Sequence, residues 1–518
     1  SFFSDSTDFG KRPFYVSRVN GNDSVIKNSN PNLQTGSGYK QLDLVQRFRF
    51  QPKPNQEHGL NLQVSTSSDV PRYDRLTETR NGLPRYAEWY YGPQKRVLLA
   101  YDFEHRNDTV HPTRILHIGA NHQWIEESRN TRNFRSDNRS VRLERLQVSG
   151  FNLDYKRKDG AHTLRIGGDF QGNVLVSTAA KVSVTGNGNS PESTRYPDGT
   201  NRFYNSGVFL SHSWDLHPKI TLNEALRGGF THLYATFRDK SFYPFPFSEI
   251  KQTNFVYSGS LGLVYRPLPA TKLSALVSTG FRSPNIDDLA KIFDSAPGTL
   301  IVPNPNLKPE KTLNGELNFD AQITKAIRWQ GAGYYTFLYD AIVTDSFSFA
   351  GSRTAEYNGQ MSQVFANQNQ SQAFIAGYST GFQYQISKAV SAEGSVSYTY
   401  GRVVQTGRHI PLDHIPPVVS RLAISYEKAS IRLMLYVLYN GQKKIKDYRL
   451  NGEDNEAYAL VNGLPSWYTV NLRFQHTINS HFDVYGGIEN ILDVRYRTFA
   501  SGINGAGRNL SFTLKARL

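Results

Sequence analysis

Apolar and polar residues alternate with a period of two along most of this chain. Clear examples lie at 97–103, 255–265, 431–439 and 510–518. Successive side chains of a strand point to opposite faces, so each segment is predicted to be a strand with one apolar and one polar face. The pattern predicts an all-β fold. In a water-soluble sandwich the apolar face would meet a core, whereas in a membrane barrel it would meet lipid.

The lengths of the connections separate these two architectures. The alternation predicts nineteen strands, at 42–51, 58–67, 95–106, 113–124, 140–157, 161–175, 203–216, 219–237, 252–266, 270–280, 312–323, 326–340, 371–386, 389–404, 417–427, 430–441, 467–478, 481–490 and 508–518. Every second connection is short, as at 158–160 and 387–388. Most of the others are long, as at 68–94, 281–311 and 341–370. Short turns at one end and long loops at the other are typical of outer-membrane barrels. We therefore predict a large antiparallel transmembrane β-barrel.

The composition fits strands, and not helices, as the membrane-crossing elements. The mean hydropathy is −0.51, and no apolar run approaches the roughly 18 residues of a transmembrane helix. The 30 Tyr and 31 Phe suit the aromatic girdles of a barrel. The chain has no cysteine, which excludes disulfides and thiol catalysis.

The charge of the chain is strongly positive. A formal net charge of +15 is one sign of nucleic-acid binding. Here, however, the arginines are spread along the alternating strands, as at Arg47 and Arg49. This distribution favours a basic barrel lumen or attraction to an anionic glycolipid, with solvated surface charge as the alternative. We expect no nucleic-acid partner.

Two short boxes flank one long predicted loop. They are Phe281–Pro284 (FRSP) and Asn304–Leu307 (NPNL). Pro284 and Pro305 fix their own backbone and restrict the preceding residue, so the boxes are expected to shape the loop and bring Arg282 and Asn304 near each other. Asp287 and Asp288 between the boxes are expected to pair with Arg282 and Lys291 or to bind a cation.

Three more segments follow in order along the chain. They are Tyr357–Gly359 with Asn367, Pro411–Pro417 (PLDHIPP), and Gly487–Asp493 with Tyr496. Together with the two boxes, they resemble the corresponding segments of TonB-dependent outer-membrane receptors, most closely the haem and haemoglobin receptors. Two features depart from that pattern: Leu518 stands where an aromatic residue is usual, and no histidine lies between the boxes.

The resemblance implies a complete fold of about 22 strands around a plug domain. Residues 1–518 would then be barrel throughout, with 19 or 20 of those strands. Ser1–Thr7 would be the end of the third strand. The first two strands, the plug and the segment that recruits a TonB-type energising protein would all lie upstream of Ser1.

The candidate ligand-binding residues come from the boxes and the long loops. They are Arg282, Asn304, His409, His414, Tyr86, Trp89 and Tyr90. A histidine in an extracellular loop could ligate haem iron, but for His414 the favoured interpretation is that it merely pins the chain before Pro416 and Pro417. The aromatic residues of 86–91 could stack a planar ligand, grip a protein or form a membrane-surface belt. Whether the chain holds a metal ion is left open by the sequence.

We therefore expect an active transporter in the bacterial outer membrane. Haem or haem-protein iron is the first candidate ligand, a ferric siderophore the second and cobalamin the third, each as cargo and not as a permanent cofactor. A passive porin or surface-binding barrel is the rival. We expect no enzymatic activity, since no nucleophile signature is present. Expected partners are outer-membrane lipid, lipopolysaccharide and a surface lipoprotein.

Overall fold

The computed structural model describes residues 11–517 except 187, 243–246, 291–292, 297, 350, 358–359, 406–407, 450–453, 455, 457–458 and 503. The strand end expected at Ser1–Thr7, the final Leu518 and Asn358–Gly359 lie outside the described residues, as does Lys291.

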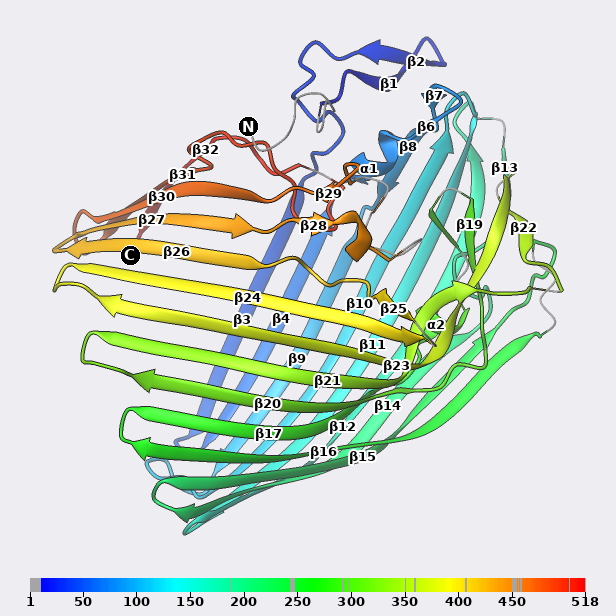
Figure 1. Cartoon of the computed structure of the whole chain (residues 1–518). Coiled ribbons are helices and arrows are strands. Elements are labelled where there is room, and N and C mark those ends of the chain that lie inside the picture. The colour runs from blue at the N-terminus through cyan, green and yellow to red at the C-terminus, as the bar shows by residue number, and fades with distance from the viewer. Residues whose placement is uncertain are drawn as a thin grey trace.

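The chain forms one large antiparallel sheet that curls into a barrel (Figure 1). Each of the nineteen predicted strands overlaps one of its long strands. These are β3 (Gln41–Lys53), β4 (Gln56–Ser67), β9 (Lys95–Arg106), β10 (Arg114–Asn133), β11 (Asn138–Asp159), β12 (His162–Ser183), β14 (Asn201–His217), β15 (Ile220–Thr236), β16 (Glu249–Leu268), β17 (Thr271–Arg282), β20 (Glu310–Gln322), β21 (Ile327–Ser346), β23 (Gln360–Gln385), β24 (Val390–Gln405), β26 (Val419–Lys428), β27 (Ile431–Asn440), β30 (Trp467–Thr477), β31 (Phe482–Glu489) and β32 (Asn509–Ala516).

Short and long connections lie at opposite ends of the barrel. Each long strand pairs with the next one in sequence, so the short turns after β11 and β23 share one end, as predicted (Figure 1). At the other end, which we call the mouth, smaller elements fold. They are β1 (Phe14–Val19), β2 (Asn22–Lys27), β5 (Val70–Pro71), α1 (Tyr73–Leu76), β6 (Thr79–Arg80), β7 (Leu83–Pro84), β8 (Tyr86–Tyr91), β13 (Asn189–Pro191), α2 (Ile286–Ala290), β18 (Phe293–Ala296), β19 (Thr299–Val302), β22 (Thr354–Tyr357), β25 (Arg408–Pro411), β28 (Lys443–Lys444), the 3-10 turn η2 (Ile445–Asp447) and β29 (Gly463–Leu464).

Several strands continue into segments that were predicted to be loops. β10 runs on to Asn133 and β23 begins at Gln360, although 125–139 and 341–370 were left outside the predicted strands. Pairs such as Ile342↔Asn369 still form there. Beyond the apolar band no lipid requires one apolar face, so the ladder continues without the alternation that reveals it.

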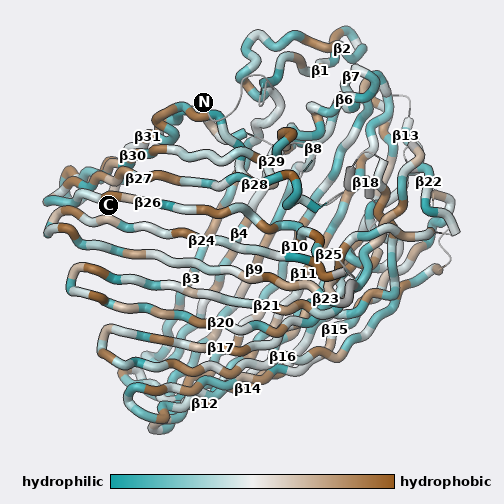
Figure 2. Tube along the Cα trace, in the orientation of Figure 1, coloured by the Kyte–Doolittle hydropathy of each residue, from teal (hydrophilic) through white to brown (hydrophobic). Residues whose placement is uncertain are grey.

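The outer face of the barrel is apolar and the inner face is polar. Val208 is 69% exposed and Leu226 70% exposed on the outside. Inward, Arg227 donates to Asp169 at 2.7 Å. Hydrophobic residues recur along the barrel strands with hydrophilic residues between them (Figure 2). A soluble protein would bury the apolar face, so this inside-out pattern identifies a surface made for lipid.

A small hydrophobic core lies inside the mouth. The connection between β17 and β20 folds inward, and its Leu289, Leu300 and Leu307 pack with Leu233 of β15 and Val364 of β23. β19 pairs in parallel with β23. The loop that carries the two boxes is therefore part of the packed interior of the mouth.

The two outermost strands of the sheet differ from the rest. Every residue of β3 and of β32 is exposed. β3 pairs with β4, and β32 with β31. Of the ladders that the described residues make, none joins β3 to β32.

A basic and aromatic cavity at the mouth of the barrel

The two boxes meet through a small network of hydrogen bonds. Arg282 donates to Asp288 at 2.7 Å and also bonds Glu310 of β20. Asn304 donates through Nδ2 to the carbonyl of Asn367 at 2.7 Å. The Asn367 side chain in turn donates to the carbonyl of Asp288 at 3.3 Å.

These contacts place both predicted box residues in loop-shaping roles. Asn304 is 7% exposed, and its Oδ1 also accepts from the backbone N–H of Asn306. Of the two alternatives for Asp288, the pairing with Arg282 is the one observed. Asp287 accepts instead from the hydroxyl of Tyr196 at 2.6 Å.

The aromatic run at 86–91 forms a strand and not the predicted irregular loop. It is β8, which pairs with the upper part of β10 and with β5. The sequence shows no simple alternation there, but the unpaired edge of the extended β10 provides a ladder that overrides local preference. Trp89 lies opposite Thr131, so Trp89 faces inward and Tyr90 faces outward.

Arginines cover these aromatic rings. The Arg72 guanidinium lies 4.9 Å from the Trp89 ring centre, and that of Arg85 lies 4.8 Å from Tyr86. On the other face, Arg139 lies 5.8 Å from Tyr90. Cation–π contacts of this kind hold both partners at the rim without burying a bare charge.

A cavity of about 540 Å³ opens beside β8, between the wall of the barrel and the loops of the mouth. Tyr86 and Trp89 line it together with Phe134. The cationic side chains in its lining are Arg80, Arg85, Arg129, Arg135, Arg142, Lys181 and Arg195. Glu192 is the only acidic side chain among the described lining residues. We call this the mouth cavity.

Cross-strand register explains why the positive charges collect there. Arg129 lies directly opposite Arg142 on the inner face of β10 and β11, and Lys181 of β12 lies opposite Ser140. Two like charges directly opposite each other on neighbouring strands are destabilising when no anion lies between them. Among the described lining residues of the mouth cavity, the one acid is Glu192, which lies 3.6 Å from Arg142 and 3.9 Å from Lys181. An anion in the cavity would relieve this repulsion.

A second cavity of about 410 Å³ lies directly below and shares Arg129 and Arg195 with the mouth cavity. Its wall carries Glu127 opposite Glu144, one inward pair below Arg129 and Arg142. Apolar residues, among them Leu146, lie below them. From the mouth inward, the wall therefore passes from a positive layer to an acidic layer and then to an apolar one.

Glu144 is the carboxylate in the acidic layer whose pKa is clearly raised. It lies next to Arg145, which points outward and pairs with Glu126 at 3.0 Å, and this exposed ion pair marks a level beyond the lipid-facing band. Burial, followed by repulsion from Glu127, raises the pKa of Glu144 to about 7. The acidic layer can therefore change its charge near neutral pH.

The two predicted histidines lie away from the mouth cavity. His409 lies on β25 opposite Val404, on the outer face, with its ring 6.0 Å from that of Phe374. His414 has a positive φ of 63°, its backbone N–H donates to Asp454 at 2.9 Å, and its Nδ1 lies 3.3 Å from the same carboxylate. This supports the pinning role for His414, although its side chain remains 66% exposed.

Of the residues predicted from the sequence, Tyr86 and Trp89 line the mouth cavity, whereas the arginines around them were not predicted. Arg129 and Arg142 lie in 125–139 and 140–157, and only the register of the hairpin brings them together. The alternation of charged residues along both segments was a usable signal. Within the part of the chain that the structure describes, no three or more His, Asp or Glu side chains are placed to hold a metal ion.

Comparison with known proteins identifies the class. A family model described as TonB dependent receptor-like, beta-barrel, matches residues 18–491. The chain belongs to this family, whose members lie in the bacterial outer membrane. Among the described residues, no helix is long and apolar enough to cross a membrane.

Two curated relatives of low identity have names that refer to haemoglobin. The hemoglobin-haptoglobin utilization protein B of Neisseria meningitidis is 23% identical over 489 residues, which cover 86% of this chain and 57% of that protein. The probable hemoglobin and hemoglobin-haptoglobin-binding protein 4 of Haemophilus influenzae is 26% identical over 266 residues, 47% of this chain and 25% of that protein. The chain thus spans only part of the length of these relatives.

Solved structures share the fold with several kinds of receptor. The copper transporter OprC has a TM-score of 0.74 at 15% identity, covering 92% of this chain and 72% of that one. The Serratia marcescens hemophore receptor HasR has a TM-score of 0.68 at 12% identity, covering 93% and 72%. The siderophore receptor PirA of Pseudomonas aeruginosa has a TM-score of 0.63 at 12% identity, covering 93% and 71%.

Proposed function

We propose that this barrel imports haem, or iron taken from a haem protein, with energy from a TonB-type protein. The observation that carries the proposal is the mouth cavity, where seven cations and three aromatic rings surround one acid. Haem is a planar aromatic ring with two carboxylates. Arg129 and Arg142 suit the carboxylates through charge-assisted hydrogen bonds, and Trp89 offers a ring face. The proposal is also supported by the two relatives named above, a probable haemoglobin- and haemoglobin–haptoglobin-binding protein and a haemoglobin–haptoglobin utilization protein.

A ferric siderophore is the second candidate. Many ferric chelates are anionic, and a basic cavity would attract them as well. The structural likeness to siderophore receptors supports this alternative. Cobalamin remains third, since neither the charge of the cavity nor a relative favours it.

We also propose that residues upstream of Ser1 complete the receptor with a plug domain and further strands. The support lies in β3 and β32, whose residues are exposed throughout. Unpaired strand edges in a bilayer leave backbone N–H and C=O groups without partners, which costs several kcal/mol for each group. A lipoprotein at the cell surface is a possible partner for capture of a haem protein.

A haemin titration of the purified full-length receptor tests the ligand. We expect a Soret shift at micromolar haemin that weakens in Trp89→Ala and in Arg129→Gln/Arg142→Gln. Arg328→Gln is the matched control, because Arg328 pairs with Asp320 at the opposite end of the barrel. His414→Ala separates ligation of the haem iron from binding of the haem carboxylates. A Soret shift lost in this variant would indicate that His414 ligates the iron, and an unchanged shift would leave carboxylate binding. A flat titration of the wild-type receptor, together with tight binding of a ferric chelate, would establish the siderophore alternative instead.

A further inference from the structure

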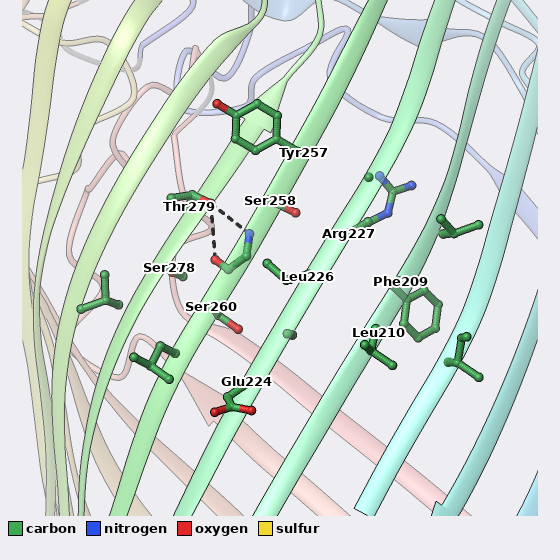
Figure 3. Close-up of a pocket in the computed structure, with 17 residues that line it drawn as sticks. Phe209, Leu210, Glu224, Leu226, Arg227, Tyr257, Ser258, Ser260, Ser278 and Thr279 are labelled. Carbon is green, nitrogen blue, oxygen red and sulfur yellow. Dashed lines mark hydrogen bonds between the residues drawn. The ribbon is translucent and has the colours of Figure 1, made fainter.

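A hollow of about 960 Å³ lies on the outer, lipid-facing surface of the barrel. It is lined by residues of β12 and of β14 to β17 (Figure 3). Its apolar walls are Val208, Leu210, Leu226, Tyr257 and Val277, all well exposed. The exposed Glu224 also lines the hollow, at its end away from the mouth, where its carboxylate lies 3.1 Å from Nδ1 of His212. None of these side chains belongs to the mouth cavity.

Two glycines create the hollow. Gly228 lies opposite Val208 and Tyr257, and Gly259 lies opposite Leu226. Where the neighbouring outward positions carry large side chains, these two positions carry none. A Cβ added at Gly228 would meet only the Phe255 ring, at 3.9 Å. The result is an apolar groove on a surface that lipid chains cover.

The register places a cationic row above this groove, toward the mouth. Arg202, Tyr234 and Lys251 lie side by side on the outer face of β14, β15 and β16. This row is six residues along the strand from the row of Gly228, or roughly 20 Å. Between the cationic row and the row of Gly228 lie two stacked aromatic rings, those of Tyr204 and His232, with centres 6.4 Å apart.

Arg202 and Lys251 differ from Lys95 and Arg145, two other cations on the outer face. Arg202 and Lys251 are both exposed, and neither makes an ion pair or side-chain hydrogen bond among the described residues. Lys95 and Arg145, at a comparable level on β9 and β11, instead share Glu126 at 3.0 Å each. The nearest acid in register is Glu249, which accepts a 3.4 Å hydrogen bond from Tyr234.

We propose that this face holds one phosphorylated, acylated glycolipid of the outer leaflet. Its phosphate contacts Arg202 and Lys251, and one acyl chain descends past Tyr204 into the groove at Gly228. The order cation, aromatic ring, apolar groove matches the order phosphate, interface, acyl chain in such a lipid. The inference depends on the outer-membrane location of the family and not on the identity of the imported ligand.

Native mass spectrometry of the purified full-length receptor tests this site. The receptor is extracted in mild detergent, and retained lipopolysaccharide is counted per molecule. We expect Arg202→Gln/Lys251→Gln to weaken retention about fivefold for each cation removed. Gly228→Leu fills the groove without meeting backbone and should also lower retention, with the cations intact.

Lys95→Gln/Arg145→Gln is the matched control, because it removes two outward cations that already share a carboxylate. It should leave retention unchanged. Equal losses in the control and in the Arg202 and Lys251 variant would overturn the site. The site would also be overturned if added phosphatidylglycerol displaced lipopolysaccharide equally from the wild type and from the variants. That result would show that the receptor recognises only one negative charge of a headgroup. A folded Gly228→Leu receptor with full retention would contradict the acyl groove.

Discussion

Arg129 and Arg142 carry the largest share of the proposed recognition. They face each other across the β10–β11 ladder, and the nearest acid to Arg142, Glu192, lies 3.6 Å away. A hydrogen bond to a charged group contributes about 1.5–3 kcal/mol. The double change to Gln is therefore expected to weaken haemin binding by on the order of 100-fold, with a smaller effect for either single change.

This prediction is checked by equilibrium titration at two salt concentrations. The wild-type affinity should fall as salt rises, because the pairing is electrostatic and partly exposed. The double variant should lose most of that salt dependence. An unchanged affinity in the double variant would remove these arginines from the site.

Glu144 predicts a pH dependence for the same site. Its raised pKa, about 7, means that the folded receptor holds a proton that the unfolded chain releases near pH 4.5. Stability is therefore lost as pH rises through the window from about 4.5 to 7. The same ionisation adds a negative charge below Arg129, so anion binding should weaken on the order of tenfold between pH 6 and 8.

Glu144→Gln keeps the shape and removes the titration. In this variant the affinity for haemin should stay nearly level from pH 6 to 8, at the value that the wild type has at the acidic end. Glu249→Gln, an exposed acid on the outer face, serves as the control. A wild-type affinity that rises with pH would show that another group governs the site.

At the scale of elements, the hairpin β1–β2 depends on a buried ion pair. Asp23 accepts from Arg132 at 2.8 Å, and their side chains are 1% and 2% exposed. The hairpin lies above the barrel at its mouth (Figure 1). An isolated two-stranded hairpin is marginal in water, so this contact must hold it in place.

Asp23→Asn is expected to release the hairpin without unfolding the barrel. Removing one partner of a buried pair costs about 3–5 kcal/mol. Hydrogen exchange should become fast at 14–27 and stay slow in β11 and β12. Asp137→Asn, which removes only the exposed contact with Arg18, should leave exchange in the hairpin unchanged. Protection of the hairpin in Asp23→Asn would contradict this account.

Asn367 joins the two boxes and should set the shape of their loop. Its side-chain amide donates a hydrogen bond to the backbone carbonyl of Asp288. Its own backbone carbonyl accepts a hydrogen bond from the side chain of Asn304. Asn367→Ala removes the side-chain contacts, each contributing about 1 kcal/mol. We expect limited proteolysis to cut 283–309 several times faster, while the melting temperature of the barrel stays the same. Equal cleavage rates would show that the hydrophobic core of the loop is sufficient.

The sequence predicted the barrel well because lipid imposes a period of two on every membrane-crossing strand. The strand prediction failed in the segments beyond the membrane, where lipid no longer imposes a period of two. The β8 strand and the upper parts of β10 and β23 are fixed by pairing with a neighbour far along the chain, as when Trp89 meets Thr131. The positive layer has the same origin, since Arg129 and Arg142 become neighbours only through a hairpin register. The outward position of His409 has the same origin, because it is fixed by the ladder with Val404; its role as a ligand remains a prediction.

At the scale of the whole molecule, one inner wall of the barrel carries a positive, an acidic and an apolar layer in that order from the mouth. The outer surface of the barrel faces lipid. A ligand entering at the mouth meets the positive layer before the acidic one, so the wall attracts an anion and then resists its further passage. The resistance falls when Glu144 is protonated. Completion of the sheet between β32 and β3 by upstream strands would enclose this path.

The central claim is that the mouth cavity holds the ligand, and a structure of the full-length receptor with haemin bound tests it most directly. Density for the porphyrin should lie in the 540 Å³ cavity, against Trp89 and with its carboxylates beside Arg129 and Arg142. Porphyrin density elsewhere in the mouth, with this cavity empty and its arginines unmoved, would contradict the account.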